Sequence, residues 1–540
     1  MKVGTDARRR ELCPCSGNSV ESIRQHSIGD VLRRTAQRAP AKDAIICGDV
    51  RWTYAEFDRI CNRVAQSLLA RGIVPGDRVA ILSRNSHAFA ALRFALARIG
   101  AILVPINFML NADEVAYILR SSGAETLAVG PGLEELGLQA SQLETSVRRT
   151  FWVPGEDAAA TAPEGLETFA DLARGSDEPL SIVVDPRSPA QIIYTSGTES
   201  LPKGAVLSHE AVLWEYVSCA IEGEMSENDT LLHALPLYHC AQLDCFLGPA
   251  VYLGCTNIIT GLPRPDVILP LISRHSINSF FCPPTVWISL LRSDLFDSTD
   301  LSSLQKGYYG ASIMPVEVLM EMQRRLPKVR LWNYYGQTEI APLAAVLKPG
   351  DQLRKAGSAG RPVLNVETRV VDDAMQDVKP GEIGEIVHRS PQLLSAYFNA
   401  PEKTAEAFAG GWFHSGDLAT VDAEGYITIV DRKKDMIKTG GENVASREVE
   451  EAIFAMSEVS EVAVVGIPDP KWVEAVVAAV VVKSGHVLDG KRVVEHCRQQ
   501  MAHFKVPKHV VFVDSLPKNP SGKLLKRDLR QRFEKELVGR

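Results

Sequence analysis

A loop rich in hydroxyl groups and glycine follows the apolar run Gln191–Tyr194 and could bind phosphate. It reads Thr195-Ser-Gly-Thr-Glu-Ser-Leu-Pro-Lys203. Glycine lets backbone N–H groups approach an anion closely, the hydroxyl groups add side-chain donors, and the lysine adds a positive charge. The spacing differs from the P-loop, from the dinucleotide GxGxxG fingerprint and from the hydrolase GxSxG elbow. Because Ser, Thr and Gly also gather in ordinary turns, the loop alone leaves both interpretations open.

Four further motifs follow this loop in a fixed order. Taken singly, they have plain structural explanations: Thr338 and Glu339 could cap a helix, and Asp417 with Arg432 could be a surface ion pair. The motifs read Pro236-Leu-Tyr-His239, Tyr334-Tyr-Gly-Gln-Thr-Glu339, Trp412-Phe-His-Ser-Gly-Asp417 with Asp431-Arg-Lys-Lys-Asp435-Met-Ile-Lys-Thr-Gly-Gly-Glu-Asn443, and Asn519-Pro-Ser-Gly-Lys523.

Together the five motifs resemble those of the adenylate-forming superfamily, which includes acyl-CoA synthetases, firefly luciferase and peptide-synthetase adenylation domains. The resemblance extends over residues 28–535. It implies an α/β fold with a large N-terminal domain of stacked α/β and β subdomains and a small mobile C-terminal α+β lid. We predict a disordered N-terminus over residues 1–27, an AMP-binding domain over 28–433 and a lid domain over 434–540.

The resemblance implies a two-step reaction that uses ATP, Mg²⁺ and CoA. A carboxylate is a poor electrophile, so joining it to a thiol requires a better leaving group, which AMP on the carbonyl provides. The first step makes acyl-AMP and pyrophosphate, and the second transfers the acyl group to CoA. The resemblance assigns ATP or AMP to Thr195, Ser196, Gly197, Thr198, Lys203, Gly310, Ala311, Ser312, Tyr335, Gly336, Gln337, Thr338, Asp417 and Arg432.

Within this set, the base and the ribose have their own residues. By resemblance, Tyr335 stacks on adenine, and the backbone of Gly310–Ser312 borders both the adenine and the acyl group. Asp417 can accept hydrogen bonds from both ribose hydroxyls, and Arg432 can donate to them.

The phosphates are assigned to the Thr195–Lys203 loop and, at the α-phosphate, to Thr338. By resemblance Glu339 coordinates Mg²⁺, an ion that prefers hard oxygen ligands. Most relatives carry Thr-Thr-Gly where this chain has Thr198-Glu199-Ser200. An unpaired carboxylate there would repel ATP, so Glu199 could reach Mg²⁺, pair with Lys203 or point away.

The lid is implied to serve both steps. Lys523 bridges the carboxylate and the α-phosphate in the first step, where its charge stabilises the transition state. The lid then rotates about a hinge at Lys434, and Lys438-Thr-Gly-Gly-Glu-Asn443 faces the acyl-AMP. The paired glycines would let pantetheine pass beside the backbone. The resulting CoA path consists of Lys438, Gly440, Gly441 and Glu442, and Lys438 is also a candidate catalytic residue.

His239 occupies the position where family members gate the acyl channel or steer the carboxylate. A buried core histidine is the alternative. The expected acyl pocket contains Tyr238, His239, Gln242, Leu243 and Ile313. Its linings are mostly apolar, with Gln242 and Asp244 as exceptions, which favours a hydrophobic acyl or aryl acid of undetermined length.

The elements that must position these residues alternate in type. Arg78–Leu82 predicts a strand, Ser86–Ile99 a helix and Ala101–Pro105 a strand, which is typical of α/β layers. Residues 154–189 predict an exposed connection, and glycine-bounded segments between 361 and 431 predict a small β-rich subdomain. Beyond residue 435 we predict a helix at Ser446–Phe454, apolar runs at 462–467 and 476–482, and a final basic helix.

Composition narrows the function classes. The 540 residues carry 59 Lys and Arg against 66 Asp and Glu, a net charge of −7, which predicts no nucleic-acid partner. Arg93 and Arg98 interrupt the most apolar stretch, Ala88–Leu110, so no membrane span is expected. Of the ten cysteines only Cys13 and Cys15 form a close pair, without the second pair that a zinc site needs. Without an apolar leader segment, we expect a protein of the reducing cytoplasm.

Three functional hypotheses follow. The first is an AMP-forming acyl-CoA ligase for a fatty or arylalkanoic acid, with the acid, ATP and CoA as its small-molecule partners. The second keeps adenylation but uses an amine, a carrier protein or nitrite as acceptor. The third is a non-catalytic nucleotide or acyl-AMP binding protein, for which the bridging Lys523 would be unnecessary. A homodimer remains open.

Overall fold

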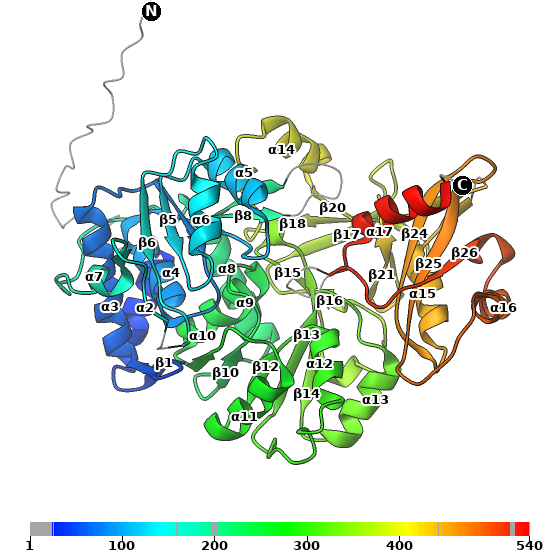
Figure 1. Ribbon diagram of the computed structural model, residues 1–540, viewed down its shortest axis with the longest axis horizontal. Helices are drawn as coiled ribbons and strands as arrows, with labels where there is room; N and C mark the ends of the chain where they lie inside the picture. Colours follow the sequence, from blue (N-terminus) through cyan, green and yellow to red (C-terminus); the bar gives the residue numbers. More distant parts are fainter. Residues whose placement is uncertain are drawn as a thin grey trace, which may run out of the picture.

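The computed structural model describes residues 24, 26–157, 160–195, 202–440, 442–518 and 524–538. Within these ranges the chain folds into mixed α/β layers, and the predicted class is confirmed (Figure 1). The strands of residues 437–512 and the helices around them gather at one end of the molecule, beyond β17 and β21 (Figure 1).

The eight-stranded sheet holds the strands on either side of the predicted phosphate loop. These two strands pair antiparallel, with Thr195 opposite Lys203. In spatial order the strands are β19 (Ala396–Tyr397), β9 (Lys203–Ser208), β8 (Pro189–Thr195), β4 (Ile102–Pro105), β3 (Arg78–Leu82), β5 (Thr126–Val129), β6 (Arg149–Trp152) and β7 (Glu167–Thr168).

The nine-stranded sheet carries Tyr335 near the end of one of its strands. Strands β10 and β12–β14 form a parallel run, so their carboxyl ends meet at one edge, where α/β sheets bind ligands. In spatial order the strands are β16 (Arg361–Pro362), β15 (Leu343–Leu347), β14 (Arg330–Gly336), β13 (Lys306–Gly310), β12 (Ser279–Phe281), β10 (Thr230–His233), β11 (Thr256–Ile259), β1 (Asp43–Cys47) and β2 (Val50–Thr53).

Helix α4 (His87–Ile99) lies in the core cluster that includes residues of both large sheets. Ser86 caps its first turn, and every residue of the helix is buried. Arg93 and Arg98 are also buried, and each is paired with a carboxylate: Arg93 lies 3.1 Å from Asp244, and Arg98 contacts Asp58. The prediction of a core helix and strand over this stretch is confirmed.

The remaining helices of residues 28–433 pack on the sheets or connect their strands. They are α2 (Ile28–Arg38), α3 (Tyr54–Ala70), α5 (Ala112–Ser122), α6 (Glu134–Ser141), α7 (Phe169–Leu172), α8 (His209–Glu222), α9 (Cys240–Gln242), η1 (Leu243–Leu247), α10 (Gly248–Leu253), α11 (Pro265–His275), α12 (Pro284–Leu291), α13 (Val316–Arg325), η2 (Thr338–Ile340), η3 (Pro349–Asp351), α14 (Pro401–Ala407) and η4 (Ala409–Gly411).

The expected connection over residues 154–189 contains more structure than predicted. It supplies the edge strand β7 and the short helix α7. The Thr168 side chain caps α7, while the Asp171 carboxylate accepts a hydrogen bond from the Thr168 backbone in return. Thr168 and Asp171 have the three-residue spacing of a capping box, but the surrounding Ala, Gly and Pro residues favoured the prediction of a loop.

The β-rich subdomain predicted between residues 361 and 431 is present as a four-stranded antiparallel sheet. Its strands are β17 (Glu367–Val371), β18 (Gly384–Arg389), β20 (Phe413–Val421) and β21 (Ile427–Arg432). Gly381 and Gly425 have φ angles of +88° and +81° in the connections, a backbone region that favours glycine. Asp417 of β20 lies directly opposite Arg432 of β21.

The C-terminal residues form a separate sheet covered by helices on both faces. Helices α15 and α16 pack on one face, and α17 packs on the other. The predicted helix at Ser446–Phe454 is confirmed, and the two apolar runs at 462–467 and 476–482 lie in strands β24 and β25. The elements are β22 (Ile437–Thr439), β23 (Glu442–Val444), α15 (Ser446–Phe454), β24 (Val459–Asp469), β25 (Val473–Val482), α16 (Gly490–Gln500), η5 (His503–Lys505), β26 (His509–Phe512), α17 (Lys526–Phe533) and η6 (Glu534–Val538).

Asp431 joins the four-stranded sheet to the C-terminal sheet. Helix α15 has no side-chain cap at its own N-cap residue, Ala445. Instead, the Asp431 carboxylate accepts hydrogen bonds from the backbone N–H and the hydroxyl of Ser446, both at 2.7 Å. A carboxylate at this position also interacts favourably with the helix dipole. No helix in the described ranges is long and apolar enough to cross a membrane.

Candidate active site

Tyr335, Asp417 and Arg432 meet where the nine-stranded sheet approaches the four-stranded sheet. The Tyr335 hydroxyl donates to Oδ2 of Asp417 at 2.7 Å, and Nε of Arg432 lies 3.2 Å from Oδ1. Burial and then the Asp417 carboxylate raise the pKa of Tyr335 well above its usual range, so Tyr335 remains a donor. The predicted base and ribose residues are therefore adjacent.

The hairpin of β8 and β9 brings Thr195 and Lys203 together. The Thr195 hydroxyl donates to the backbone oxygen of Lys203 at 3.4 Å. Ser196, Gly197, Thr198 and Glu199, the other predicted phosphate-loop residues, lie outside the described residues.

Glu339 and Lys203 are linked by an aromatic side chain that the sequence did not single out. The Tyr397 hydroxyl donates to Oε1 of Glu339 at 3.0 Å. Nζ of Lys203 lies 5.2 Å from the centre of the Tyr397 ring, within the range of a cation–π contact. Tyr397 reaches this position because β19 pairs with β9, placing Tyr397 opposite Ala205. The lysine and the candidate metal ligand thus share one neighbour.

Glu339 has the chemistry that Mg²⁺ requires. Its carboxylate is half-buried, Tyr397 occupies Oε1, and no described residue donates to Oε2. Because Mg²⁺ usually retains several waters and takes one or two carboxylates together with substrate phosphates, a single available oxygen suffices. Glu339 therefore fits the ion, whereas Glu199 cannot be assessed from the described residues.

Thr338 is buried beside the histidine motif. Its hydroxyl lies 3.2 Å from the Cys240 thiol, which in turn lies 3.8 Å from Nδ1 of His239. Burial raises the pKa of Cys240 well above its usual range, so it remains a neutral thiol. The same Nδ1 accepts a hydrogen bond from the Ala241 backbone at 3.2 Å, and His239 thereby caps α9.

Tyr238 and Leu243 are buried, and Ile313 is half-buried. The Tyr238 ring meets Phe108 edge-on at 5.4 Å between centres. Gln242 belongs to a buried polar network, because its amide nitrogen lies 2.7 Å from Nδ1 of His233. Burial lowers the pKa of His233 to about 4, so this histidine is neutral near pH 7.

The Gly310–Ser312 segment begins at the end of β13. A Cβ atom on Gly310 would lie 2.5 Å from the Tyr334 backbone oxygen, which explains the glycine. Ala311 follows with a φ of +65°, an uncommon conformation for alanine, and both Ala311 and Ser312 are exposed. Gly336 is similarly constrained, since a Cβ there would lie 1.7 Å from the Pro342 backbone oxygen. The backbone N–H of Gln337 donates to that same oxygen at 3.0 Å.

Two of the predicted CoA-path residues form hydrogen bonds with residues in or next to β25. The Lys438 backbone donates to Glu474 at 2.7 Å, and the Gly440 backbone donates to the Trp472 oxygen at 2.7 Å. Glu442 is exposed at the start of β23, and Lys434 is exposed between β21 and β22. Gly441 and Lys523 lie outside the described residues. The structure thus brings the nucleotide and phosphate candidates together and leaves the lid candidates in a separate group.

Comparison with known proteins matches this arrangement. Residues 32–398 match the AMP-binding enzyme family, and residues 448–523 match the AMP-binding enzyme C-terminal domain. Feruloyl-CoA synthase from Amycolatopsis sp. is 36% identical over 512 residues, covering 95% of this chain and 100% of that protein. The long-chain-fatty-acid–CoA ligase FadD13 of Mycobacterium tuberculosis is also 36% identical, covering 94% and 98%.

A solved structure supports the same assignment. The anthranilate CoA ligase AuaEII in complex with anthranoyl-AMP superposes with a TM-score of 0.86 at 27% identity, covering 94% of this chain and 97% of that one. Because the family match extends over most of the chain and curated relatives align along nearly their full length, the chain belongs to the AMP-binding enzyme family of adenylate-forming enzymes.

Proposed function

We propose that this ATP-dependent acid–thiol ligase activates a hydrophobic aryl or fatty acid as acyl-AMP and transfers the acyl group to CoA. The observation that carries the proposal is the pair of polar clusters around the turn that follows β14. Tyr335, Asp417 and Arg432 meet before the turn, and Glu339, Tyr397 and Lys203 meet after it. One cluster suits a ribose and the other suits phosphates.

In the first step, an oxygen of the substrate carboxylate attacks the α-phosphorus of ATP, and the bond to pyrophosphate breaks. Lys203 and the hydroxyls around Thr195 neutralise and hold the leaving phosphates, while Thr338 donates to the α-phosphate. Mg²⁺ bound to Glu339 would offset the negative charge that builds up on the phosphates. Asp417 and Arg432 fix the ribose, so that the α-phosphorus faces the acid.

Lys523 is proposed to complete this step. A cation that bridges the carboxylate and the α-phosphate stabilises the charge of the transition state. Lys434 would serve as the hinge, and domains 28–433 and 434–540 would be the two bodies that it joins.

In the second step, the CoA sulfur attacks the acyl carbonyl and AMP leaves. A cavity of about 300 Å³ beside Gly440 supports CoA as the acceptor; it is lined by Thr439, Gly440, Trp472, His503, Phe504 and Lys508. Nζ of Lys508 and Nζ of Lys471 lie 5.2 and 4.7 Å from the Trp472 ring. Aromatic faces stack on nucleobases, and lysines bind phosphate, so this cavity matches the nucleotide end of CoA.

The acid class follows from the apolar lining and from the relatives. Tyr238, Leu243 and Ile313 offer carbon surface, and the relatives are named for feruloyl and long-chain fatty acyl groups. We therefore propose both aryl and aliphatic acids as candidates. The eight described cysteines are buried free thiols, which is compatible with a reducing cytoplasm.

The decisive experiment measures pyrophosphate release across aryl-propenoic, arylacetic and short- to long-chain fatty acids, each with and without CoA. Release that depends on the acid, together with acyl-CoA formed only when CoA is present, is expected. Acid-dependent release without thioester would indicate another acceptor. Nucleotide binding without release for any acid would indicate a non-catalytic binding protein.

Tyr397→Phe tests the phosphate cluster. Loss of the hydroxyl removes a hydrogen bond to a charged carboxylate, so adenylation at limiting Mg²⁺ should fall about tenfold. Tyr194→Phe is the matched control, because its hydroxyl donates at 2.9 Å to Ser121 rather than to Glu339. Pyrophosphate release across a Mg²⁺ titration gives the comparison. Equal behaviour of the two variants would contradict the proposed role of Glu339.

Trp472→Ala tests the acceptor. Loss of one aromatic stacking partner should raise the KM for CoA about tenfold and leave adenylation unchanged. Phe512→Ala is the control, because Phe512 is a 40% exposed aromatic residue of the same domain outside the cavity. Steady-state kinetics with varied CoA measures the effect, and an unchanged KM would separate this cavity from the acceptor.

A further inference from the structure

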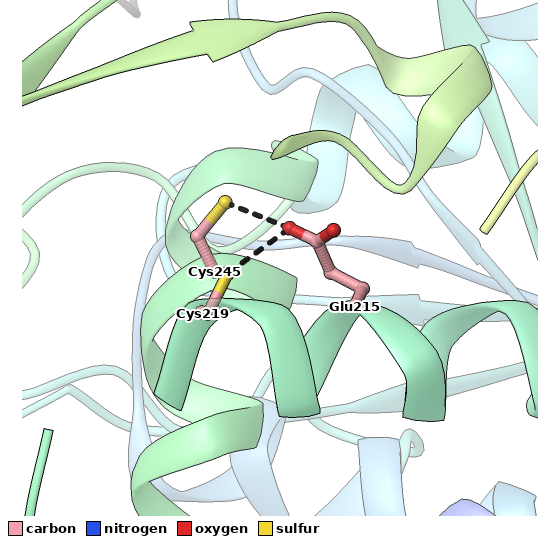
Figure 2. A group of neighbouring side chains, drawn as sticks. All are labelled: Glu215, Cys219 and Cys245. Atoms are coloured by element: carbon pink, nitrogen blue, oxygen red, sulfur yellow. Dashed lines mark hydrogen bonds between the residues drawn. The ribbon is translucent and has the colours of Figure 1, made fainter. Parts of the chain in front are cut away.

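A carboxylate on α8 is buried close to the turn that follows β14, and none of the described residues gives it a charged partner. Glu215 of α8 is fully buried, and its Oε1 accepts hydrogen bonds from the thiols of Cys219 and Cys245 at 3.1 and 3.2 Å. Figure 2 shows both sulfur atoms directed at this one oxygen. The Leu343 backbone N–H donates to the same oxygen at 3.0 Å. Sequence patterns gave no sign of this group, since an acidic residue within a helix normally faces solvent.

Gln392 completes the arrangement from the other side. Its amide nitrogen donates to Oε2 of Glu215 at 2.6 Å, to the Leu343 oxygen at 3.0 Å and to the Ile340 oxygen at 3.3 Å. Its amide oxygen accepts from the Ser218 hydroxyl at 2.6 Å, which fixes the orientation of the amide. Glu215 and Gln392 therefore hold the backbone of residues 340–343 between them.

The held backbone lies directly after Thr338 and Glu339. Two residues beyond Gln392, the Leu394 backbone N–H donates to the backbone carbonyl oxygen of Glu339 at 2.7 Å. Three residues further, Tyr397 donates to the Glu339 carboxylate. Residues 392–397 thus form hydrogen bonds with the turn at several positions. Glu215 holds the first of these residues, Gln392.

Metal binding explains the cluster of Glu215, Cys219 and Cys245 less well than hydrogen bonding does. Glu215, Cys219 and Cys245 place one ligand atom each within 4.8 Å of one another. A thiol ligates a metal as thiolate, yet burial raises the pKa of both thiols well above the usual range. Both S–H groups are instead aimed at the carboxylate.

We propose that Glu215 is a positioning residue for adenylation, and that its carboxylate, through Leu343 and Gln392, fixes the turn that carries Thr338 and Glu339. This inference rests on the proposed function for its catalytic part. It follows from the geometry that the carboxylate is needed as an acceptor at both oxygens. Burial raises the pKa of Glu215 to about 8, and the hydrogen bonds from Cys219, Leu343 and Cys245 oppose that shift, so the ionised form that accepts at both oxygens predominates above about pH 8.

Glu215→Gln tests this directly. The amide keeps the size of the side chain but presents an NH₂ group to at least one of the four donors, so one contact with Leu343 or Gln392 must open. Adenylation should fall about tenfold, as for the loss of one hydrogen bond to a charged group, and its half-maximal Mg²⁺ concentration should rise. Thioester formation from supplied acyl-AMP should change less than about threefold, because Glu339 is not required once pyrophosphate has left.

Two variants separate positioning from general stability. Cys245→Ser keeps a donor to Glu215 and should behave as the unmodified protein does. The double variant Glu215→Gln with Gln392→Glu restores a hydrogen bond between the two side chains, but the new carboxylate cannot donate to Ile340 or Leu343. The double variant should therefore fail to regain adenylation.

Hydrogen–deuterium exchange over residues 337–347 gives a readout that does not depend on activity. Exchange should be faster in Glu215→Gln than in Cys245→Ser. If Glu215→Gln does not fold, Ser218→Ala can replace it, because this variant releases the Gln392 amide and leaves Glu215 unchanged. Ser218→Ala should speed exchange over the same residues and lower adenylation about threefold. Unchanged exchange, or equal losses in both half-reactions, would overturn the inference. No pyrophosphate release by the unmodified protein would overturn the proposed function, and the exchange measurement would still decide whether Glu215 holds the turn.

Discussion

The hydrogen bond between Tyr335 and Asp417 joins the nine-stranded sheet to the four-stranded sheet, and the candidate nucleotide site depends on that junction. Tyr335 lies near the end of β14, the last strand of the parallel run, whereas Asp417 and Arg432 face each other across an antiparallel pair. Neither sheet alone could place a hydroxyl, a carboxylate and a guanidinium group within hydrogen-bonding distance. The pairing also satisfies groups that would otherwise be buried without partners, which is why this contact can be both structural and functional.

Beyond the turn, the buried polar groups are likewise paired with hydrogen-bonding partners. Glu339 must remain ionised to bind a cation, yet it lies half-buried beside apolar strands. The Tyr397 hydroxyl donates to the Glu339 carboxylate, and Nζ of Lys203 lies over the Tyr397 ring. Further inside, Glu215 and Gln392 hold the backbone that leads away from Glu339. The polar groups thus extend from the half-buried Glu339 of the candidate phosphate site to the fully buried Glu215, and we propose that the inner groups restrain the outer ones.

Much of this could be predicted from the sequence, but by two different routes. The apolar pattern alone was sufficient to predict α4, β4 and α15. The five motifs, through their resemblance to a known family, supplied Tyr335, Glu339, Asp417 and Arg432. Tyr397 could not be predicted, because it depends on a two-residue strand pairing with β9, nearly two hundred residues away. Glu215 was missed for a similar reason, since three of its four donors come from distant segments and leave no periodic pattern.

Titration of the unmodified protein and of Asp417→Ala with AMP, followed by calorimetry, tests whether the ribose binds at Asp417. We expect the ribose to bind at the junction of the two sheets, where the Asp417 carboxylate can accept hydrogen bonds from its hydroxyl groups. AMP should therefore bind to the unmodified protein, and Asp417→Ala should weaken binding at least about tenfold, as expected for losing hydrogen bonds to a charged group. Asp422→Ala, in the connection between β20 and β21 and paired with Lys355, should bind AMP normally. Equal AMP affinity in Asp417→Ala and the unmodified protein would contradict the account.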